Sequence, residues 1–209
     1  MTIPEPLLRK VARALLLVGV AAPLFALASV LIAVACYADF NHARQYLSEL
    51  GGATATQPWI FNVGVMIAGA MTAVAGGGFG LAILLLCRAP VSAVVIGGLF
   101  VAAGVGLFLS SLYPWPDPRH MAINLGLGIQ LAPVFLLIAL RQTLAMTRLK
   151  QFLLGVFVLM VVLTVLTKHL VFPGTVNDFN VGYWERAFAI VLVGWVGVAA
   201  HLMRRQLRS

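Results

Sequence analysis

The sequence predicts an all-α protein that crosses a membrane several times as one helical bundle. Of its 209 residues, 62% are hydrophobic and 10% are charged, and the mean hydropathy is +1.02. Soluble domains carry about 25% charged residues. Six apolar runs are long enough to cross the roughly 30 Å of hydrocarbon in a bilayer. They cover approximately residues 14–37, 58–87, 91–113, 120–140, 152–168 and 184–203. Little sequence remains between them, so residues 1–209 are expected to form a single six-helix transmembrane domain.

The charged residues predict the orientation of this bundle. Most of the 14 basic residues flank span ends that share one side, namely Arg9, Lys10, Arg13, Arg88, Arg141, Arg148, Lys150, Arg204, Arg205 and Arg208. Most of the 6 acidic residues lie on the other side, namely Asp39, Glu49, Asp117, Asp178 and Glu185. The positive-inside rule makes the basic side cytoplasmic. We therefore expect both termini in the cytoplasm, a location in the cytoplasmic (inner) membrane, and no nucleic-acid partner behind the net charge of +8.

The first run, residues 14–37, is followed by a polar segment with its own helical pattern. A cleavable secretory signal has an apolar core of only about 7–15 residues, so this longer run is interpreted as an uncleaved span. After it, apolar residues recur at helical spacing between a capping residue and a glycine pair, in the order Asp39, Phe40, Ala43, Leu47, Leu50 and Gly51-Gly52. This pattern predicts a short interfacial helix. In another interpretation, it is a lid that directs His42, Ser48 or Glu49 into the bundle.

The second, third and fourth runs are rich in glycine at positions suited to helix packing. Gly76 and Gly80 form a small-xxx-small pair, and further glycines follow at Gly97, Gly98, Gly104, Gly106, Gly126 and Gly128. Small residues let membrane helices approach closely. These faces are expected to pack helices within the chain or against other copies or other membrane proteins.

The fourth run begins with a polar stripe. Asp117 before Pro118 is a favourable pair for the N-cap and first position of a helix. Asp117, His120 and Asn124 then share one face at i, i+3 and i+7. In one interpretation His120 is a base or a metal ligand oriented by Asp117. In the other, Asp117 only caps the helix and His120 lies at the headgroup level.

The sixth run begins with two charged residues that need partners. Glu185 and Arg186 enter the span by about one turn, and a charge inside a membrane is costly unless it is paired. Neighbours in a helix diverge by about 100°, so these two do not face each other. Arg119, Arg44, Lys168 or a metal ion are the partners considered for Glu185. An ion-pair network between helix ends and a working site explain this pair equally well.

Three short motifs resemble those of a known family. They are Ser48 to Gly51 after the first span, Pro116-Asp117 with His120 at the fourth, and Gly182 to Arg186 at the sixth. In order and placement they resemble domain of unknown function 998, a family of prokaryotic six-span membrane proteins. The resemblance implies a fold and a location but no activity. A looser likeness to membrane-embedded zinc hydrolases of the ceramidase type lacks their late His-x-x-x-His pair.

Together these residues predict an outward-facing polar site. We expect it to bind a lipid headgroup or small amphiphile, with membrane lipids as partners, and in a catalytic version to hydrolyse the bound lipid. The residues assigned to catalysis are His120, Asp117 and Glu49. The residues assigned to binding are Arg186, Glu185, Ser48, Arg44 and Asn124. No cofactor is assigned, and a single divalent metal near Asp117 and His120 stays open. The alternatives are a structural or assembly subunit and a transporter. The scarcity of ionisable groups in the inner halves of the spans argues against the transporter.

Overall fold

The described part of the chain is entirely helical. The computed structural model describes residues 4–122, 127–167 and 174–208, and these residues contain no strand. In chain order the elements are α1 (Glu5–Ala35), the 3-10 helix η1 (Leu47–Gly51), α2 (Pro58–Cys87), α3 (Pro90–Leu112), α4 (Pro118–Ala122), α5 (Leu127–Leu140), the 3-10 helix η2 (Leu144–Met146), α6 (Thr147–Thr167) and α7 (Val181–Gln206). Within the described ranges, five helical stretches are long and apolar enough to cross a membrane, and α5 is a shorter apolar helix.

Proline sets the start of several helices. Pro58, Pro90 and Pro118 each occupy the first helical position of α2, α3 and α4. Proline is favoured there because its fixed φ suits a helix and its missing N–H would have no helical partner. Between α2 and α3 the chain reverses through Arg88, which adopts a left-handed φ of 50°. The predicted boundaries of the second and third spans therefore agree closely with the structure.

The bundle is held together by close helix contacts and an aromatic core. The rings of Phe79 and Phe100 stack with centroids 4.4 Å apart, and Trp195 meets Phe100 edge-on at 5.8 Å. Gly19 of α1 lies where a Cβ would be 3.1 Å from Ala75 Cβ of α2 and 3.2 Å from the Ala200 Cβ of α7. Small residues therefore bring α1, α2 and α7 together around one point of the core.

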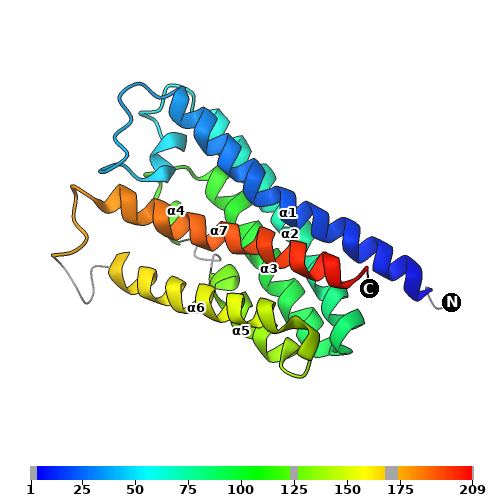
Figure 1. Cartoon of the computed structure of the whole chain (residues 1–209). Helices are drawn as coiled ribbons and strands as arrows, with labels where there is room; N and C mark the ends of the chain where they lie inside the picture. Colours follow the sequence, from blue (N-terminus) through cyan, green and yellow to red (C-terminus); the bar gives the residue numbers. More distant parts are fainter. Residues whose placement is uncertain (1–3, 123–126, 168–173, 209) are drawn as a thin grey trace.

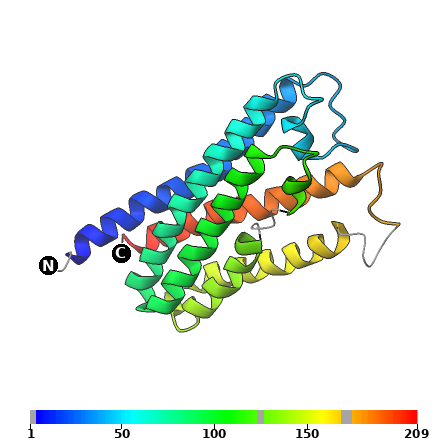
Figure 2. The ribbon, with the colours of Figure 1, turned by 180° about the vertical axis from the view of Figure 1, so that it is seen from behind.

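The two ends of the molecule differ in charge. Both termini lie at one end, together with the turns that join α2 to α3 and α5 to α6 (Figure 1). The segment between α1 and α2, and the residues that lead into α7, lie at the opposite end, which the reverse view also shows (Figure 2). The basic loops predicted to share one side therefore do gather at the terminal end. The other end, called here the outer end, carries the candidate site residues.

The helix predicted after the first span is much shorter than expected. Residues 36–46 form turns, and only Leu47–Gly51 is helical, as a 3-10 helix. Asp39 does not act as the predicted cap but takes a left-handed φ of 59°. Instead, Asn41 Oδ1 accepts hydrogen bonds from the N–H groups of Ala43 (3.1 Å) and Arg44 (3.2 Å). Within the segment, the N–H groups of Arg44 and Gln45 both donate to the carbonyl of Asn41. Other main-chain groups of the segment bond to α7, so the local hydrogen bonds do not continue into an α-helix.

Candidate functional site

The outer site is built where residues 42–49 pack on the first turns of α7. The N–H of Gly182 donates to the carbonyl of Ala43 at 2.7 Å. A Cβ at Gly182 would lie 2.5 Å from the His42 carbonyl oxygen and 2.6 Å from the Gln45 carbonyl oxygen. Only glycine allows so close an approach. The first residue of the Gly-x-x-x-Arg motif therefore docks the loop onto α7.

Glu185 is anchored to the main chain of the same loop. Its Oε2 accepts a hydrogen bond of 2.6 Å from the N–H of Leu47. Of the partners considered from the sequence, Arg119 pairs with Asp117 and the Arg44 guanidinium stacks on the ring of Phe179 at 4.7 Å. Lys168 lies outside the described residues. Sequence reasoning considered side chains and a metal, whereas the partner present in the structure is a backbone amide.

Glu49 is engaged at both oxygens. Its Oε1 accepts from the N–H of Tyr46 at 2.7 Å, and its Oε2 accepts from Gln45 Nε2 at 3.1 Å. The first contact is half of a capping box at the start of η1. Ser48 precedes it in η1 and is half-buried. Glu49 thus shapes the turn that presents Gln45 and Leu47 to α7.

The rest of the Ser-Glu-Leu-Gly motif fixes η1 to the bundle. Leu50 is fully buried, with 1% of its surface exposed. The carbonyl of Gly51 accepts from Asn62 Nδ2 of α2 at 3.0 Å. A Cβ at Gly51 would collide with the Asn62 side chain, so the position suits glycine alone. These contacts place the whole segment between α1, α2 and α7.

Arg186 is held in place by several contacts. Its Nη1 donates to the carbonyls of Gln45 (2.9 Å) and Gly182 (2.6 Å). Its guanidinium carbon lies 5.2 Å from the ring centroid of Phe40. The second terminal nitrogen, Nη2, is buried and has no acceptor among the described residues. Burying a guanidinium N–H without an acceptor costs free energy, so Nη2 is the atom of this site that would gain most from a ligand oxygen.

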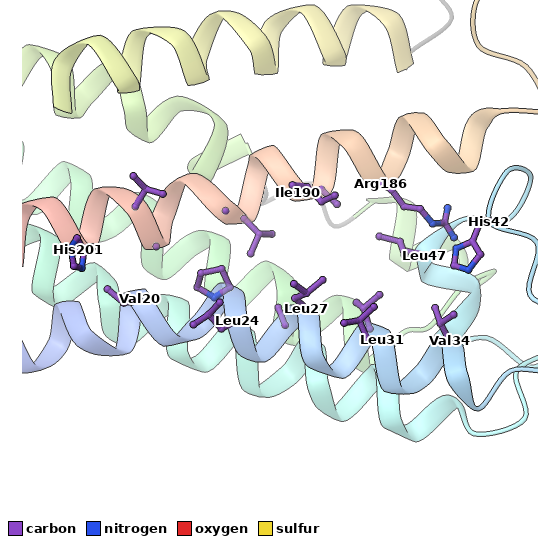
Figure 3. Close-up of a pocket in the computed structure, with 18 of the residues that line it drawn as sticks. Val20, Leu24, Leu27, Leu31, Val34, His42, Leu47, Arg186, Ile190 and His201 are labelled. Carbon is purple, nitrogen blue, oxygen red and sulfur yellow. The ribbon is translucent and has the colours of Figure 1, made fainter. Parts of the chain in front are cut away.

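Arg186 stands at the end of an apolar groove. A cavity of about 630 Å³ lies between α1 and α7 and is lined by aliphatic side chains along its length. Figure 3 shows Arg186 and His42 at its outer end, His201 at its other end, and Leu24, Leu27 and Ile190 between them. Ligand-binding cavities commonly have volumes of about 300–1,000 Å³ and mostly apolar walls. The arrangement suits a molecule with one anionic end and one hydrocarbon end.

Asp117, Arg119 and His120 form a second, separate group at the junction of α3 and α4. Asp117 Oδ1 accepts from the Arg119 N–H at 2.8 Å, which confirms Asp117 as the cap of the helix that starts at Pro118. The Arg119 side chain bonds both Asp117 oxygens, and mainly through this contact the pKa of Asp117 is lowered to about 2. His120 Nδ1 lies 2.9 Å from the Tyr113 carbonyl and 3.2 Å from the Ser110 carbonyl.

The structure thus brings together some of the predicted site residues and not others. Glu49, Glu185 and Arg186 all bond to residues 45–47. The outer cluster is defined here as Gln45, Leu47, Glu49, Glu185 and Arg186. Across the described ranges, no hydrogen bond or ion pair connects this cluster to Asp117 or His120. The loops that carry the two groups touch through the rings of Tyr46 and Trp115, whose centroids are 6.0 Å apart.

The predicted binding residue Asn124 and the possible metal site are not found among the described residues. Asn124 lies outside the described residues, and no group of three or more His, Cys, Asp or Glu side chains suited to a metal ion occurs in the part of the chain that the structure describes. His42 was considered from the sequence as a residue that a lid directs into the bundle, whereas the role of Gln45 and the groove between α1 and α7 were missed. No local pattern marks them, because Gln45 acts through its main-chain carbonyl and the groove depends on how two distant helices pack.

These features define a polytopic helical membrane protein with a charged cluster at the end opposite its termini. Residues 20–202 match the family described as protein of unknown function (DUF998), and the chain belongs to that family. The family resemblance drawn from the three motifs is therefore confirmed. Comparison with curated proteins and with solved structures gave no match.

Proposed function

We propose that the outer cluster binds the anionic headgroup of a membrane amphiphile. The observation that carries this proposal is Arg186 Nη2, which is buried and has no acceptor in the part of the chain that the structure describes, while Nη1 is fixed by two carbonyls. Arg186 also lines the mouth of the groove. A small rotation of the guanidinium about its Nη1 contacts would turn Nη2 toward a headgroup oxygen there. Arginine suits this task because its charge persists at any physiological pH and its N–H groups match phosphate and carboxylate oxygens.

The proposal includes a specific placement in the membrane. We propose that the chain forms one domain with six spans, of which α4 and α5 together make the fourth. We also propose that the protein lies in the cytoplasmic (inner) membrane with both termini in the cytoplasm. The five long apolar helices and the shorter α5 support the span count. The basic residues at the terminal end support the orientation through the positive-inside rule. The outer cluster then faces away from the cytoplasm.

Binding is favoured over hydrolysis by the state of the candidate bases. Both oxygens of Glu49 already accept hydrogen bonds. His120 Nδ1 faces two main-chain carbonyls that can only accept, so the basic lone pair of this ring lies on Nε2. A general base must come within hydrogen-bond reach of the proton that it removes, at a point shared with the substrate. His120 belongs to a different group from Arg186, and a metal near it would compete with Arg119 for both Asp117 oxygens.

The assembly alternative gains no specific support from the glycines. Gly76, Gly80 and Gly104 face the neighbouring helix of the same chain, where an added Cβ would lie 2.9 Å or less from an atom of that helix. Gly98 has no atom within 4 Å of such a Cβ and faces outward. Most of the predicted packing glycines are therefore used within the bundle.

Lipid content of the purified protein tests the proposal. Arg186→Gln removes the charge but keeps a polar side chain, and Arg119→Gln is the matched control because it removes an outer-end charge outside the cluster. We expect co-purified anionic lipid, measured by native mass spectrometry, to fall about tenfold or more in Arg186→Gln, since truncating a buried charge partner costs about 2–5 kcal/mol. The control should retain it.

A charge-preserving variant and a stability measurement separate loss of lipid binding from loss of the fold. Arg186→Lys preserves the charge and should retain part of the lipid even if it loosens the loop. Thermal unfolding of each variant shows whether the fold survives. Equal anionic lipid in the wild type, Arg186→Gln and Arg119→Gln would contradict the proposal.

A further inference from the structure

We infer that the ligand is an amphiphile with a single negative charge whose aliphatic chain lies in the groove between α1 and α7. This inference rests on the proposed headgroup site and adds the class of ligand and the path of its chain. Figure 3 shows the groove running along both helices, with Arg186 at its outer end. The occupant is therefore placed with its head at Arg186 and its chain pointing toward His201.

The length of the groove suits a long hydrocarbon chain. Its lining on α1 extends from Val20 to Val34. At a rise of 1.5 Å per residue this is about 21 Å, which exceeds the roughly 15 Å of one leaflet's hydrocarbon. A chain in this groove would therefore remain against protein from the outer interface to beyond the bilayer midplane.

The groove is a consequence of how α1 and α7 pack. At its inner part they approach closely, since a Cβ at Gly197 would lie 2.8 Å from Pro23 Cγ. Farther out, α7 contributes the small residues Ala189 and Gly194 to the groove wall. A Cβ at Gly194 would have no neighbour within 4 Å. The space between the two helices is therefore open because small residues of α7 do not fill it.

The groove borders a second cavity inside the bundle. A second cavity of about 200 Å³ lies among α1, α2, α3, α5 and α7. Both cavities are lined by Pro23, Ala26, Val30, Leu47, Ala189 and Val193. A chain in the groove would thus contact residues that also line the interior of the bundle.

The charges at the groove mouth limit the headgroup to one negative charge. Of the two terminal nitrogens of Arg186, only Nη2 has no acceptor within residues 4–122, 127–167 and 174–208. The Glu185 and Glu49 side chains both bond to residues 45–47 beside it. A second negative charge on the ligand would face these carboxylates in a low-dielectric setting, where repulsion between like charges is strong. Arg186 can neutralise one negative charge, so the headgroup is expected to be a monoanion.

The lining also favours a binding site over a route for headgroups. His42 and Arg186 lie at one end of the groove and His201 at the other, and the side chains between them carry no ionisable group. A charged headgroup moving from one end to the other would cross about 20 Å of apolar wall without a partner. The head is therefore held at the outer end while the chain occupies the rest.

Photolabelling with defined probes tests this placement. The probe is hexadecyl methyl phosphate, which carries one negative charge, with a diazirine at mid-chain, added to the purified protein in detergent. We expect the label on α1 and α7 near Leu27 and Ile190, read by mass spectrometry of peptides, and not on α6. The same chain ending in an uncharged alcohol should label these positions at least about tenfold less, since a charged hydrogen bond is missing.

A matched pair of glycine variants tests the groove itself. Gly194→Phe places a ring in the groove from a position where an added Cβ has no neighbour within 4 Å, and Gly155→Phe makes the same change at an exposed position of α6 where the Cβ is equally unhindered. Labelling of α1 and α7 should be lost in Gly194→Phe and unchanged in Gly155→Phe. Equal labelling in the two variants, or equal labelling by the alcohol, would overturn the inference.

The outcomes separate this inference from the proposed headgroup site. If Arg186→Gln abolishes charge-dependent labelling while Gly194→Phe does not, the headgroup site stands and the chain lies elsewhere. If Gly194→Phe abolishes labelling while Arg186→Gln leaves the preference for the charged probe intact, the groove stands and Arg186 is not the headgroup site.

Discussion

Gly182 and Arg186 lie one helical turn apart and bond to the same short loop. Arg186 Nη1 joins the carbonyl of Gly182 to that of Gln45, and the Gly182 N–H holds the carbonyl of Ala43. The missing side chain at Gly182 is what allows the loop to reach this position. The motif therefore has a structural reason, because it attaches the segment after α1 to the start of α7.

Gly182→Ala should therefore destabilise the protein although alanine is the better helix former. The new Cβ would lie 2.7 Å or less from Arg186 Nη1 and two loop carbonyl oxygens, so the loop must shift. Overpacking of this kind typically costs about 1–3 kcal/mol. Chemical unfolding in detergent measures the change in free energy. Gly194→Ala, in the same helix with no close neighbour, is the control and should be neutral or slightly stabilising. Equal stability of the two variants would contradict the argument.

Asp117 predicts a pH dependence. In the unfolded chain a carboxyl has a pKa near 3.9, whereas the pKa of Asp117 in the folded protein is about 2 because Arg119 bonds to the charged form. Its stabilisation is therefore complete above about pH 4 and is lost as the pH falls toward 2. Asp117→Asn can still cap α4 but does not titrate. The difference in unfolding free energy between the wild type and this variant should shrink between about pH 4 and pH 2. A constant difference would show that the pairing is not formed.

At this scale the sequence predicted some roles well and missed others. Asp117 was predicted as a cap because a cap depends on residues next to it in the chain. The partner of Glu185 was not predicted because the Leu47 N–H is 138 residues away and carries no side-chain signature. A charged residue inside a span indicates that a partner exists, but the fold alone determines which one.

The pairing of α2 and α3 depends on glycine at the contact. A Cβ at Gly104 would collide with the Gly69 carbonyl and lie 2.8 Å from the Ala73 N–H nitrogen, and a Cβ at Gly76 would lie 2.9 Å from the Gly97 carbonyl oxygen. Backbone therefore meets backbone along the contact. Between membrane helices, where no hydrophobic driving force operates, such close packing is a principal source of association.

A leucine at Gly104 should therefore separate the two helices, whereas a leucine at Gly98 should not. The two glycines lie on the same helix, but Gly98 has no atom within 4 Å of an added Cβ. We expect Gly104→Leu to lower the free energy of unfolding by about 3 kcal/mol or more, because backbone cannot yield as a flexible side chain can. Gly98→Leu should change it by less than about 0.5 kcal/mol. Unfolding in detergent gives both values, and similar losses would contradict the packing described.

The segment after α1 shows where an element cannot be predicted from its pattern. Apolar residues there recur at helical spacing, yet only Leu47–Gly51 is helical. The carbonyls of Ala43 and Gln45 and the N–H of Leu47 bond to α7 instead. Tertiary hydrogen bonds thus use main-chain groups that a longer helix would pair locally. By contrast, α2 and α3 were predicted closely, because their ends are marked by proline and by the end of an apolar run.

Across the whole molecule, the apolar runs account for the bundle because hydrophobic length alone decides whether a helix can span. The least regular case is the fourth run, residues 120–140, where the structure has α4, α5 and four residues between them outside the described ranges. The orientation of the bundle depends on this run, since a run that did not cross would place every later loop on the opposite side.

Cysteine accessibility decides whether residues 118–140 cross the membrane. In a variant with Cys36→Ser and Cys87→Ser, single cysteines are introduced by Ala53→Cys, Thr147→Cys or Phe179→Cys, all at exposed positions. Ala53 and Thr147 are separated by α2, α3 and the fourth run, whereas Thr147 and Phe179 are separated by α6 alone. If the fourth run crosses, a membrane-impermeant maleimide applied to intact cells should label positions 53 and 179 and reach position 147 only after permeabilisation. Labelling of 53 and 147 from the same side would show that it does not cross. Labelling of 147 alone from outside would reverse the proposed orientation and place the outer cluster in the cytoplasm. The expected pattern follows because each crossing changes the side of the membrane, and three crossings separate residues 53 and 147.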